Sequence, residues 1–149
     1  MTRLPHFDPP PDIDIARPFW EAVERRELFL PRCSGCGRWQ WYPDAAGPDC
    51  PDAELVWTPV AHTGEVHTMT TVRRGFLPDG RDDPPFVVGF VELDGVEGVR
   101  LVVNMAEDDR IRIGSRVRAT FEPLGERLHP VFVLDEAANS LRNAAEAVP

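Results

Sequence analysis

The cysteines constrain this chain more than any other feature, because Cys33-Ser34-Gly35-Cys36 forms a C-x-x-C knuckle. A glycine in such a knuckle permits the tight turn that aims both thiolates at one metal ion. A ribbon site normally ends with a second C-x-x-C pair, but here Cys50 is followed by Ala53 in the fourth place. The spacing predicts a degenerate zinc ribbon over residues 33–58.

Three interpretations of this module stay open. In the first, zinc is bound by Cys33, Cys36 and Cys50 together with Asp49, Asp52 or water. In the second, the ribbon folds without metal and is held by its aromatic side chains. In the third, the cysteines form a redox pair. No βαβ pattern surrounds the knuckle, which argues against a thioredoxin-like role. Nothing nearby supplies a base for a catalytic zinc. We therefore expect a structural module, and the metal-free ribbon is preferred over the zinc-loaded one.

The charge balance restricts the partners of the chain. Its 149 residues include 16 arginines and 25 acidic residues, a net charge of -9, and no lysine. Duplex nucleic acid and anionic membranes would both repel such a chain overall, although a local arginine patch can override the average. Residues 1–15 lack the apolar segment of a secretory leader. The apolar run Phe86–Val91 is too short to span a bilayer. An odd number of cysteines does not suit a disulfide framework. We expect a soluble cytoplasmic protein that binds neither nucleic acid nor membrane.

Residues 1–32 are predicted to form an extended arm followed by a docking helix. Proline suits the first turn of a helix over Pro18–Glu27, because its missing N–H would be unpaired there anyway. Phe19, Trp20 and Val23 make an apolar stripe on this helix that must be buried. The stripe docks either on the chain's own body or on a partner subunit.

The later sequence, residues 59–134, is a series of short apolar strands, which predicts a small β-barrel or sandwich, and the number of strands favours the barrel. Gly89 lies inside the second strand and would let that strand bend across the barrel. A short turn of helix is expected over Asp108–Ser115, ending at Gly114, and residues 135–149 form a tail that is either a frayed helix or disordered. The fold class is therefore mainly β, with an N-terminal helix, a ribbon module and a five-stranded OB-fold barrel. The predicted barrel strands are Glu65–Arg73, Pro85–Leu93, Val99–Met105, Val117–Phe121 and Val131–Leu134.

Several short motifs follow one another along the chain: Pro18-Phe19-Trp20-Glu21, Leu28–Gly37, Tyr42-Pro43, Cys50-Pro51, Gly64-Glu65-Val66, Pro84–Leu93 and Ile113–Val117. In this order and spacing they resemble the rubredoxin-like zinc-ribbon plus OB-fold family. That family was long catalogued as a domain of unknown function and is associated with acyl-CoA metabolism. The resemblance covers residues 16–134.

Members of that family are generally small, non-catalytic companions of thiolase-like enzymes. The resemblance implies a subunit of an acyl-CoA thiolase, acyltransferase or steroid side-chain retro-aldolase complex, in which the partner carries the catalytic chemistry. It also implies CoA or acyl-CoA as a ligand shared with the partner, in a hetero-oligomer. Two positions depart from the family. Its ribbon usually has four cysteines, where this chain has Ala53, and a basic residue commonly occupies the position of Asp44.

A protein that handles CoA needs arginines for the phosphates and an apolar groove for the pantetheine arm. Arg73, Arg74 and Arg81 bracket a loop that also carries Phe76, an apolar residue where solvent is expected. These arginines could instead pair with aspartates of the same loop. Arg38 and the ribbon aromatics offer a second surface, unless those aromatics pack the ribbon onto the barrel. The candidate cofactor contacts are Arg38, Arg73, Arg74, Phe76 and Arg81.

Two other functions compete with the companion subunit. A ribbon joined to an OB-fold could bind single-stranded nucleic acid, but this needs a basic groove with stacking aromatics, and the net charge is -9. A stand-alone acyl-CoA thioester hydrolase needs a nucleophile and a base. None of His62, His67 and His129 has such a nucleophile at triad spacing. No catalytic residue is assigned, and we expect that the chain is not an enzyme by itself.

Overall fold

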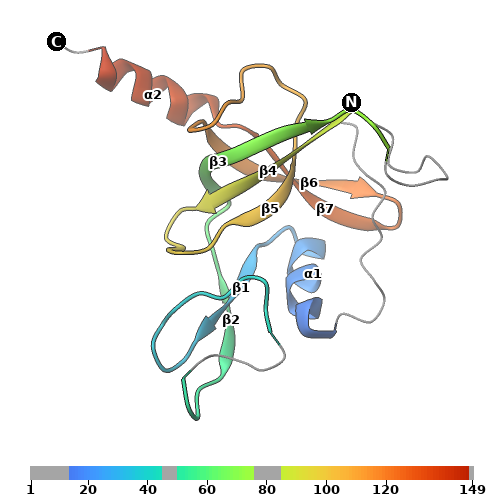
Figure 1. Cartoon of the computed structure of the whole chain (residues 1–149), viewed down its shortest axis with the longest axis vertical. Coiled ribbons are helices and arrows are strands. Elements are labelled where there is room, and N and C mark those ends of the chain that lie inside the picture. Colours follow the sequence, from blue (N-terminus) through green and yellow to red (C-terminus); the bar gives the residue numbers. More distant parts are fainter. Residues whose placement is uncertain (1–13, 45–49, 76–84, 148–149) are drawn as a thin grey trace.

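The structure is a computed structural model, and it describes residues 14–44, 50–75 and 85–147. Figure 1 shows a barrel of β3 to β7 and, below it, a two-stranded sheet of β1 and β2 with α1 alongside. The predicted mainly β architecture with an N-terminal helix and a five-stranded barrel is confirmed. The elements are η1 Asp14–Ala16, α1 Arg17–Glu24, β1 Phe29–Cys33, β2 Leu55–Pro59, β3 Thr63–Val72, β4 Phe86–Leu93, β5 Leu101–Met105, β6 Arg116–Leu124, β7 Arg127–Leu134 and α2 Glu136–Glu146.

The barrel is closed, with the strand order β3-β4-β5-β7-β6 and with β6 returning to β3. Neighbouring strands are antiparallel except β5 and β7, which run parallel and place Asn104 opposite Val131. This is the connectivity of a five-stranded OB-fold barrel. Its interior is filled by the inward-pointing side chains that alternate along each strand, and Val91, Val117 and Phe132 are fully buried there. The alternating apolar pattern identified the strands, and their number identified the OB-fold barrel.

One predicted element of the barrel region is wrong. The segment Asp108–Ser115 forms two turns, not a turn of helix. Gly114 has a φ of +85°, and its N–H donates to the Val66 carbonyl at 2.7 Å. The N–H of Arg112 donates to the Ser115 hydroxyl at 2.9 Å. These long-range and side-chain acceptors take the donors that a helix would have used, so the helix does not form.

Helix α1 docks on the chain's own body, which was the first of the two expected positions. Its apolar side chains Phe19, Ala22 and Val23 are buried, and the helix contacts β1 and β7. The helix ends at Glu24, earlier than predicted, because Arg26 has a φ of +61° and turns the chain towards β1.

Two polar contacts fasten this helix region to the β6–β7 hairpin. A carboxylate oxygen of Glu24 accepts the N–H of Leu128 at 3.0 Å, and the guanidinium of Arg26 donates to the Phe121 carbonyl at 3.2 Å. The two contacts join positions about a hundred residues apart in the sequence. They fix the orientation of α1 on the barrel beyond what apolar burial alone would specify.

Aromatic side chains join the ribbon to the barrel. The Phe19 ring lies 4.9 Å from the Trp41 ring and 5.2 Å from the Trp20 ring, and Trp20 lies 5.2 Å from the His129 imidazole of β7. The remaining ribbon tryptophans are partly buried against the same core. The aromatic run after the knuckle therefore packs the ribbon onto the barrel, as one of its two interpretations expected.

The C-terminal tail is helical, which was one of its two expected states. The carboxylate of Asp135 caps α2 by accepting the N–H of Ala138 at 3.1 Å. No residue of α2 is buried, and Figure 1 shows the helix extending away from the barrel. Neither α2 nor any other described helix is long and apolar enough to cross a membrane.

Two glycines allow the barrel strands to approach closely. A Cβ atom on Gly64 would overlap the carbonyl oxygen of Glu92. A Cβ atom on Gly89 would overlap the sulfur of Met105 and lie 3.0 Å from the Thr68 carbonyl oxygen. Gly89 is the residue predicted to let the second barrel strand cross the barrel, and the absence of its side chain is what makes room for the neighbouring strands.

We expect Gly64→Ala to lower the free energy of unfolding more than Gly89→Ala does. The obstructing atom at Gly64 is backbone, whereas the Met105 side chain beside Gly89 can move, so overpacking should cost about 1–3 kcal/mol at Gly89 and more at Gly64. Urea denaturation followed by tryptophan fluorescence measures both values. Thr70→Ala, at an exposed position of β3, is the control. Equal losses at the two glycines would contradict this account.

Candidate functional site

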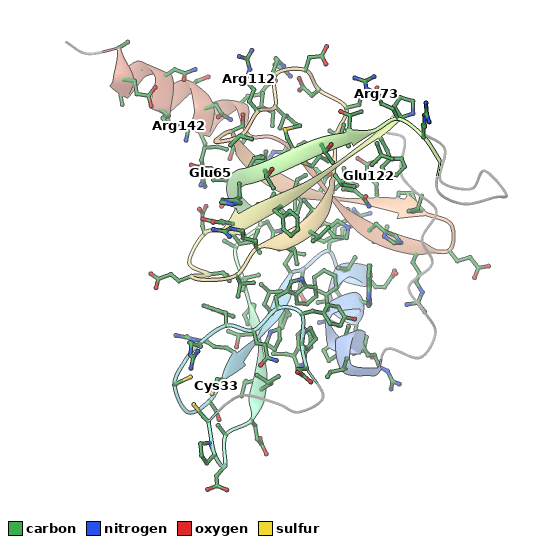
Figure 2. The ribbon with its side chains drawn as sticks, in the orientation of Figure 1. Cys33, Glu65, Arg73, Arg112, Glu122 and Arg142 are labelled. Atoms are coloured by element: carbon green, nitrogen blue, oxygen red, sulfur yellow. The ribbon has the colours of Figure 1, made fainter. Side chains whose placement is uncertain are left out.

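The three cysteines converge at the end of the ribbon that is farthest from the barrel (Figure 2). Cys33 ends β1, and the sulfur atoms of Cys33, Cys36 and Cys50 all lie within 4.8 Å of one another. The Cys36 N–H donates to the Cys33 sulfur at 3.5 Å, and the Gly37 N–H donates to the Cys33 carbonyl at 2.9 Å. The backbone thus forms a tight knuckle that points its thiols at one place.

The cluster shifts the pKa values of Cys36 and Cys50 in opposite directions. The pKa of the Cys36 thiol is lowered to about 6, first by the backbone N–H of Arg38 and then by hydrogen bonds with Cys50 and Cys33. The pKa of the Cys50 thiol is raised to about 11, first by its hydrogen bond with Cys36. In the metal-free cluster, Cys36 therefore carries the negative charge near pH 7 and Cys50 stays protonated.

The cluster matches three of the four corners of a tetrahedral zinc site. Zinc–sulfur bonds of about 2.3 Å place neighbouring sulfurs roughly 3.8 Å apart, which is compatible with sulfurs that lie within 4.8 Å of one another. Asp52 does not join the cluster, and Asp49 lies outside the described residues. Ala53 borders the cluster, because a Cβ on Gly35 would lie 3.2 Å from the Ala53 methyl and 3.7 Å from the Cys33 sulfur. Its methyl group cannot bind a metal.

The candidate cofactor residues do not gather at one place. Arg73 and Arg74 are exposed just after β3, at the edge of the barrel. Arg38 follows the knuckle that contains Cys33, and Figure 2 shows Cys33 at the opposite end of the molecule from Arg73. The guanidinium of Arg38 also contributes to the lowered pKa of Cys36, so it lies on the cysteine cluster. Phe76 and Arg81 lie outside the described residues.

The three histidines in the described part of the chain lie beside aromatic or carboxylate groups. The His62 ring lies 5.5 Å from the Phe121 ring, and Nδ1 of His67 lies 3.4 Å from the carboxylate of Glu92. His129 is buried beside Trp20. These contacts do not prepare a hydroxyl or thiol for attack on a thioester.

The outer face of β4 and β5 carries an exposed apolar pair that the sequence interpretation missed. Phe90 is 41% exposed and Val102 is 59% exposed, and they lie opposite each other in the strand register. Glu92 and Arg100, which are paired at 2.7 Å, flank them. OB folds use this face, formed by their second and third strands, to bind ligands. The signal was in the sequence, because both residues are apolar at outward positions of alternating strands.

We expect Ala53→Cys to raise the affinity of the protein for zinc. A fourth thiolate beside the three present would complete the Cys₄ set of a closed structural site. Zinc retention against a series of chelator concentrations, measured by elemental analysis, compares the variant with the unmodified chain. Asp52→Cys, one residue away and outside the cluster, is the matched control. If the unmodified chain holds one zinc as tightly as Ala53→Cys does, the fourth ligand is elsewhere and the idea of an incomplete site fails.

Comparison with known proteins links the two parts of the chain to one family. Residues 20–56 match the family model "ChsH2, rubredoxin-like zinc ribbon domain", and residues 57–122 match "ChsH2, C-terminal OB-fold domain". The probable enoyl-CoA hydratase alpha subunit of Thermomonospora curvata is 33% identical over 112 residues, which cover 73% of this chain and 34% of that protein. The chain therefore spans about a third of the length of that relative.

Two solved structures share the fold. The Ltp2-ChsH2(DUF35) aldolase contains a chain that superposes with a TM-score of 0.68 and 30% identity, over 85% of this chain and 98% of that one. A DUF35 protein of unknown function from Sulfolobus solfataricus superposes with a TM-score of 0.54 and 14% identity, over 83% and 87% of the two chains, and supports the fold alone. The same order of helix, ribbon and OB barrel is found in the family models and in the aldolase chain. This chain therefore belongs to the ChsH2 (DUF35) family.

Proposed function

We propose that the chain is a non-catalytic companion subunit of a thiolase-like acyl-CoA enzyme, namely a thiolase, an acyltransferase or a steroid side-chain retro-aldolase. The observation that carries the proposal is the match to the DUF35 chain of the Ltp2-ChsH2 aldolase over 98% of that chain. That aldolase unites an Ltp2 component with a ChsH2 component, and the proposal gives this chain the second part in a hetero-oligomer.

The chemistry of the described residues supports a companion and not an enzyme. The thiol with the lowered pKa, Cys36, belongs to a cluster that contains no histidine among the described residues. A thioester hydrolase would need a base to activate water or to protonate the leaving thiolate. The catalytic groups are therefore assigned to the partner.

CoA and its thioesters are the proposed ligand class, shared with the partner. The relative from Thermomonospora curvata is a probable enoyl-CoA hydratase subunit, which supports a CoA thioester. We assign the phosphate contacts first to Arg73 and Arg74, because both are exposed and neither makes an ion pair with a residue that the structure describes. Phe76 and Arg81 follow in the sequence, outside the described residues. Arg38 is a weaker candidate because its guanidinium interacts with Cys36.

Zinc is proposed as a structural component only if water or a residue outside the described ranges supplies the fourth ligand. The ribbon family match and the three convergent sulfurs support it. The ring contact of Phe19 with Trp41 and the other tryptophans of the ribbon hold it on the barrel without a metal. The proposed function therefore does not depend on zinc.

Co-expression of this chain with the thiolase-like enzyme encoded in the same genome should give a complex that elutes as one species in size-exclusion chromatography. Acyl-CoA turnover should require the partner, because the isolated chain has no assigned nucleophile and base. Thioester cleavage by the isolated chain would contradict the proposal in favour of a hydrolase. A monomer that binds labelled single-stranded oligonucleotide would contradict it in favour of a nucleic-acid module.

The double variant Arg73→Ala/Arg74→Ala should weaken CoA binding by the complex. Each charge-assisted hydrogen bond to a phosphate is worth about 1.5–3 kcal/mol, so the Kd should rise at least tenfold by isothermal titration calorimetry. Arg127→Ala removes one exposed arginine of the β6–β7 hairpin and is the control, expected to leave the Kd unchanged. An unchanged Kd in the double variant would remove this edge of the barrel from the CoA site.

A further inference from the structure

The cysteine cluster of the ribbon is open on the side of its fourth corner. Among the described residues, no histidine, carboxylate or further cysteine joins the three sulfurs, and the methyl group of Ala53 borders them. Cys36 is exposed, Cys50 is half-buried and Cys33 is buried. A closed structural zinc site engages every one of its sulfurs. Here an exposed thiol lies within reach of a second thiol and is accessible to small molecules in solution.

The three thiols differ in how firmly the backbone holds them. Cys33 is the last residue of β1 and pairs with Leu55 of β2. Its N–H donates to the Arg38 carbonyl at 2.8 Å, and its sulfur accepts the N–H of Cys36 at 3.5 Å. Cys36 lies in a turn and Cys50 in a bend, so neither is fixed by the register of a sheet. The Cys33 sulfur is therefore the one held most firmly in place.

A disulfide between two of these thiols needs only a local adjustment. The three sulfurs lie within 4.8 Å of one another, and a disulfide requires about 2.05 Å. Rotation about the Cα–Cβ bonds, with a small shift of the turn or the bend, brings two sulfurs to that distance. Cys36 and Cys50 are the two residues that can make this movement without disturbing the β1–β2 pairing.

We propose that Cys36 and Cys50 form a peroxide-reactive thiol pair, which closes to a disulfide while Cys33 stays a thiol. The exposed Cys36 attacks as the thiolate, so that its sulfur bonds to one oxygen of hydrogen peroxide and the O–O bond breaks. This gives a sulfenic acid and a hydroxide, which takes up a proton and leaves as water. The Cys50 sulfur then attacks the Cys36 sulfur. The S–S bond forms, the S–O bond breaks, and the departing hydroxyl leaves as water with the Cys50 proton. Two thiols are oxidised by two electrons, and one peroxide is reduced to two waters.

The disulfide and a bound zinc ion exclude each other at this place. Zinc is bound by thiolate sulfur, and the proposed disulfide removes two of the three thiolates that the cluster can offer. Oxidation would therefore release any zinc that the three cysteines hold, and reduction would restore the site. This inference is independent of the proposed companion function, because it concerns only the tip of the ribbon.

The test treats the full, chelator-stripped chain with hydrogen peroxide and blocks the remaining thiols with iodoacetamide. Peptide mapping by mass spectrometry under non-reducing conditions should show Cys36 linked to Cys50 and Cys33 alkylated, and dithiothreitol should reverse the link. Two of the three thiols should thus be lost. Cys50→Ser should stop the reaction at a sulfenic acid on Cys36, which dimedone traps. Circular dichroism establishes that the variant is folded, and the map of the unmodified chain decides the pairing in any case.

Ala53→Cys is the matched control for the open side of the cluster. With zinc bound, four thiolates would be engaged at once, so this variant should lose its thiols at least tenfold more slowly than the unmodified chain in the same zinc solution. Equal rates would show that the missing fourth ligand does not govern the reactivity, and the proposal would be wrong in its cause.

Every other result contradicts the proposal directly. A disulfide that includes Cys33 overturns the assigned pair. A sulfinic acid on Cys36 without a disulfide shows that Cys50 does not reach it. Thiols that stay unmodified while glutathione in the same solution is oxidised show that the cluster is inert. Zinc that resists the chelator and protects all three thiols shows a closed site. None of these results touches the companion function, which complex formation tests separately.

Discussion

The packing of α1 between the ribbon and the barrel is the interaction on which the rest of the structure depends. A two-stranded sheet such as β1–β2 is marginally stable by itself, and the cysteine cluster lacks a fourth protein ligand among the described residues. The ribbon therefore needs the aromatic joint formed by Phe19, Trp20, Trp41 and His129. Burying a phenylalanine contributes about 1.5–3 kcal/mol and each aromatic pair about 0.5–1.5 kcal/mol more. Contributions of this size hold the ribbon against the barrel through contacts that involve no metal.

The barrel and the knuckle were predictable because local rules decide both. Alternation of apolar residues defines the strands, and C-x-x-C brings its own two sulfurs together. The turn at Asp108–Ser115 was mispredicted because its donors find the Val66 carbonyl and the Ser115 hydroxyl, a competition that no helix propensity contains. The state of the tail stayed open because α2 meets the barrel through Asn139 and not through leucine, so its sequence carries little apolar signal. The separation of Arg38 from Arg73 depends on how the ribbon sits on the barrel, which the sequence does not reveal.

The structure also separates the arginines of the barrel from the cysteine cluster of the ribbon. Figure 2 places Arg73, Arg112 and Arg142 around the barrel, far from Cys33 at the tip of the ribbon. The proposed CoA edge thus lies on the barrel, and the tryptophans of the ribbon pack against the core on another side of it. A net charge of -9 is compatible with this arrangement, because Arg73 and Arg74 remain exposed at the proposed CoA edge.

The contacts of Glu24 with Leu128 and of Arg26 with Phe121 have a consequence for how the chain is made. They bring α1 against a hairpin that is synthesised about a hundred residues later. During translation, α1 and the ribbon must wait, with Phe19 and the tryptophans exposed to solvent, until β7 has left the ribosome. The barrel closes over shorter separations, 55 residues between Thr63 of β3 and Arg118 of β6 and 27 residues between Asn104 of β5 and Val131 of β7. Until β7 is in place, the aromatic N-terminal part of the nascent chain is the surface through which it can aggregate.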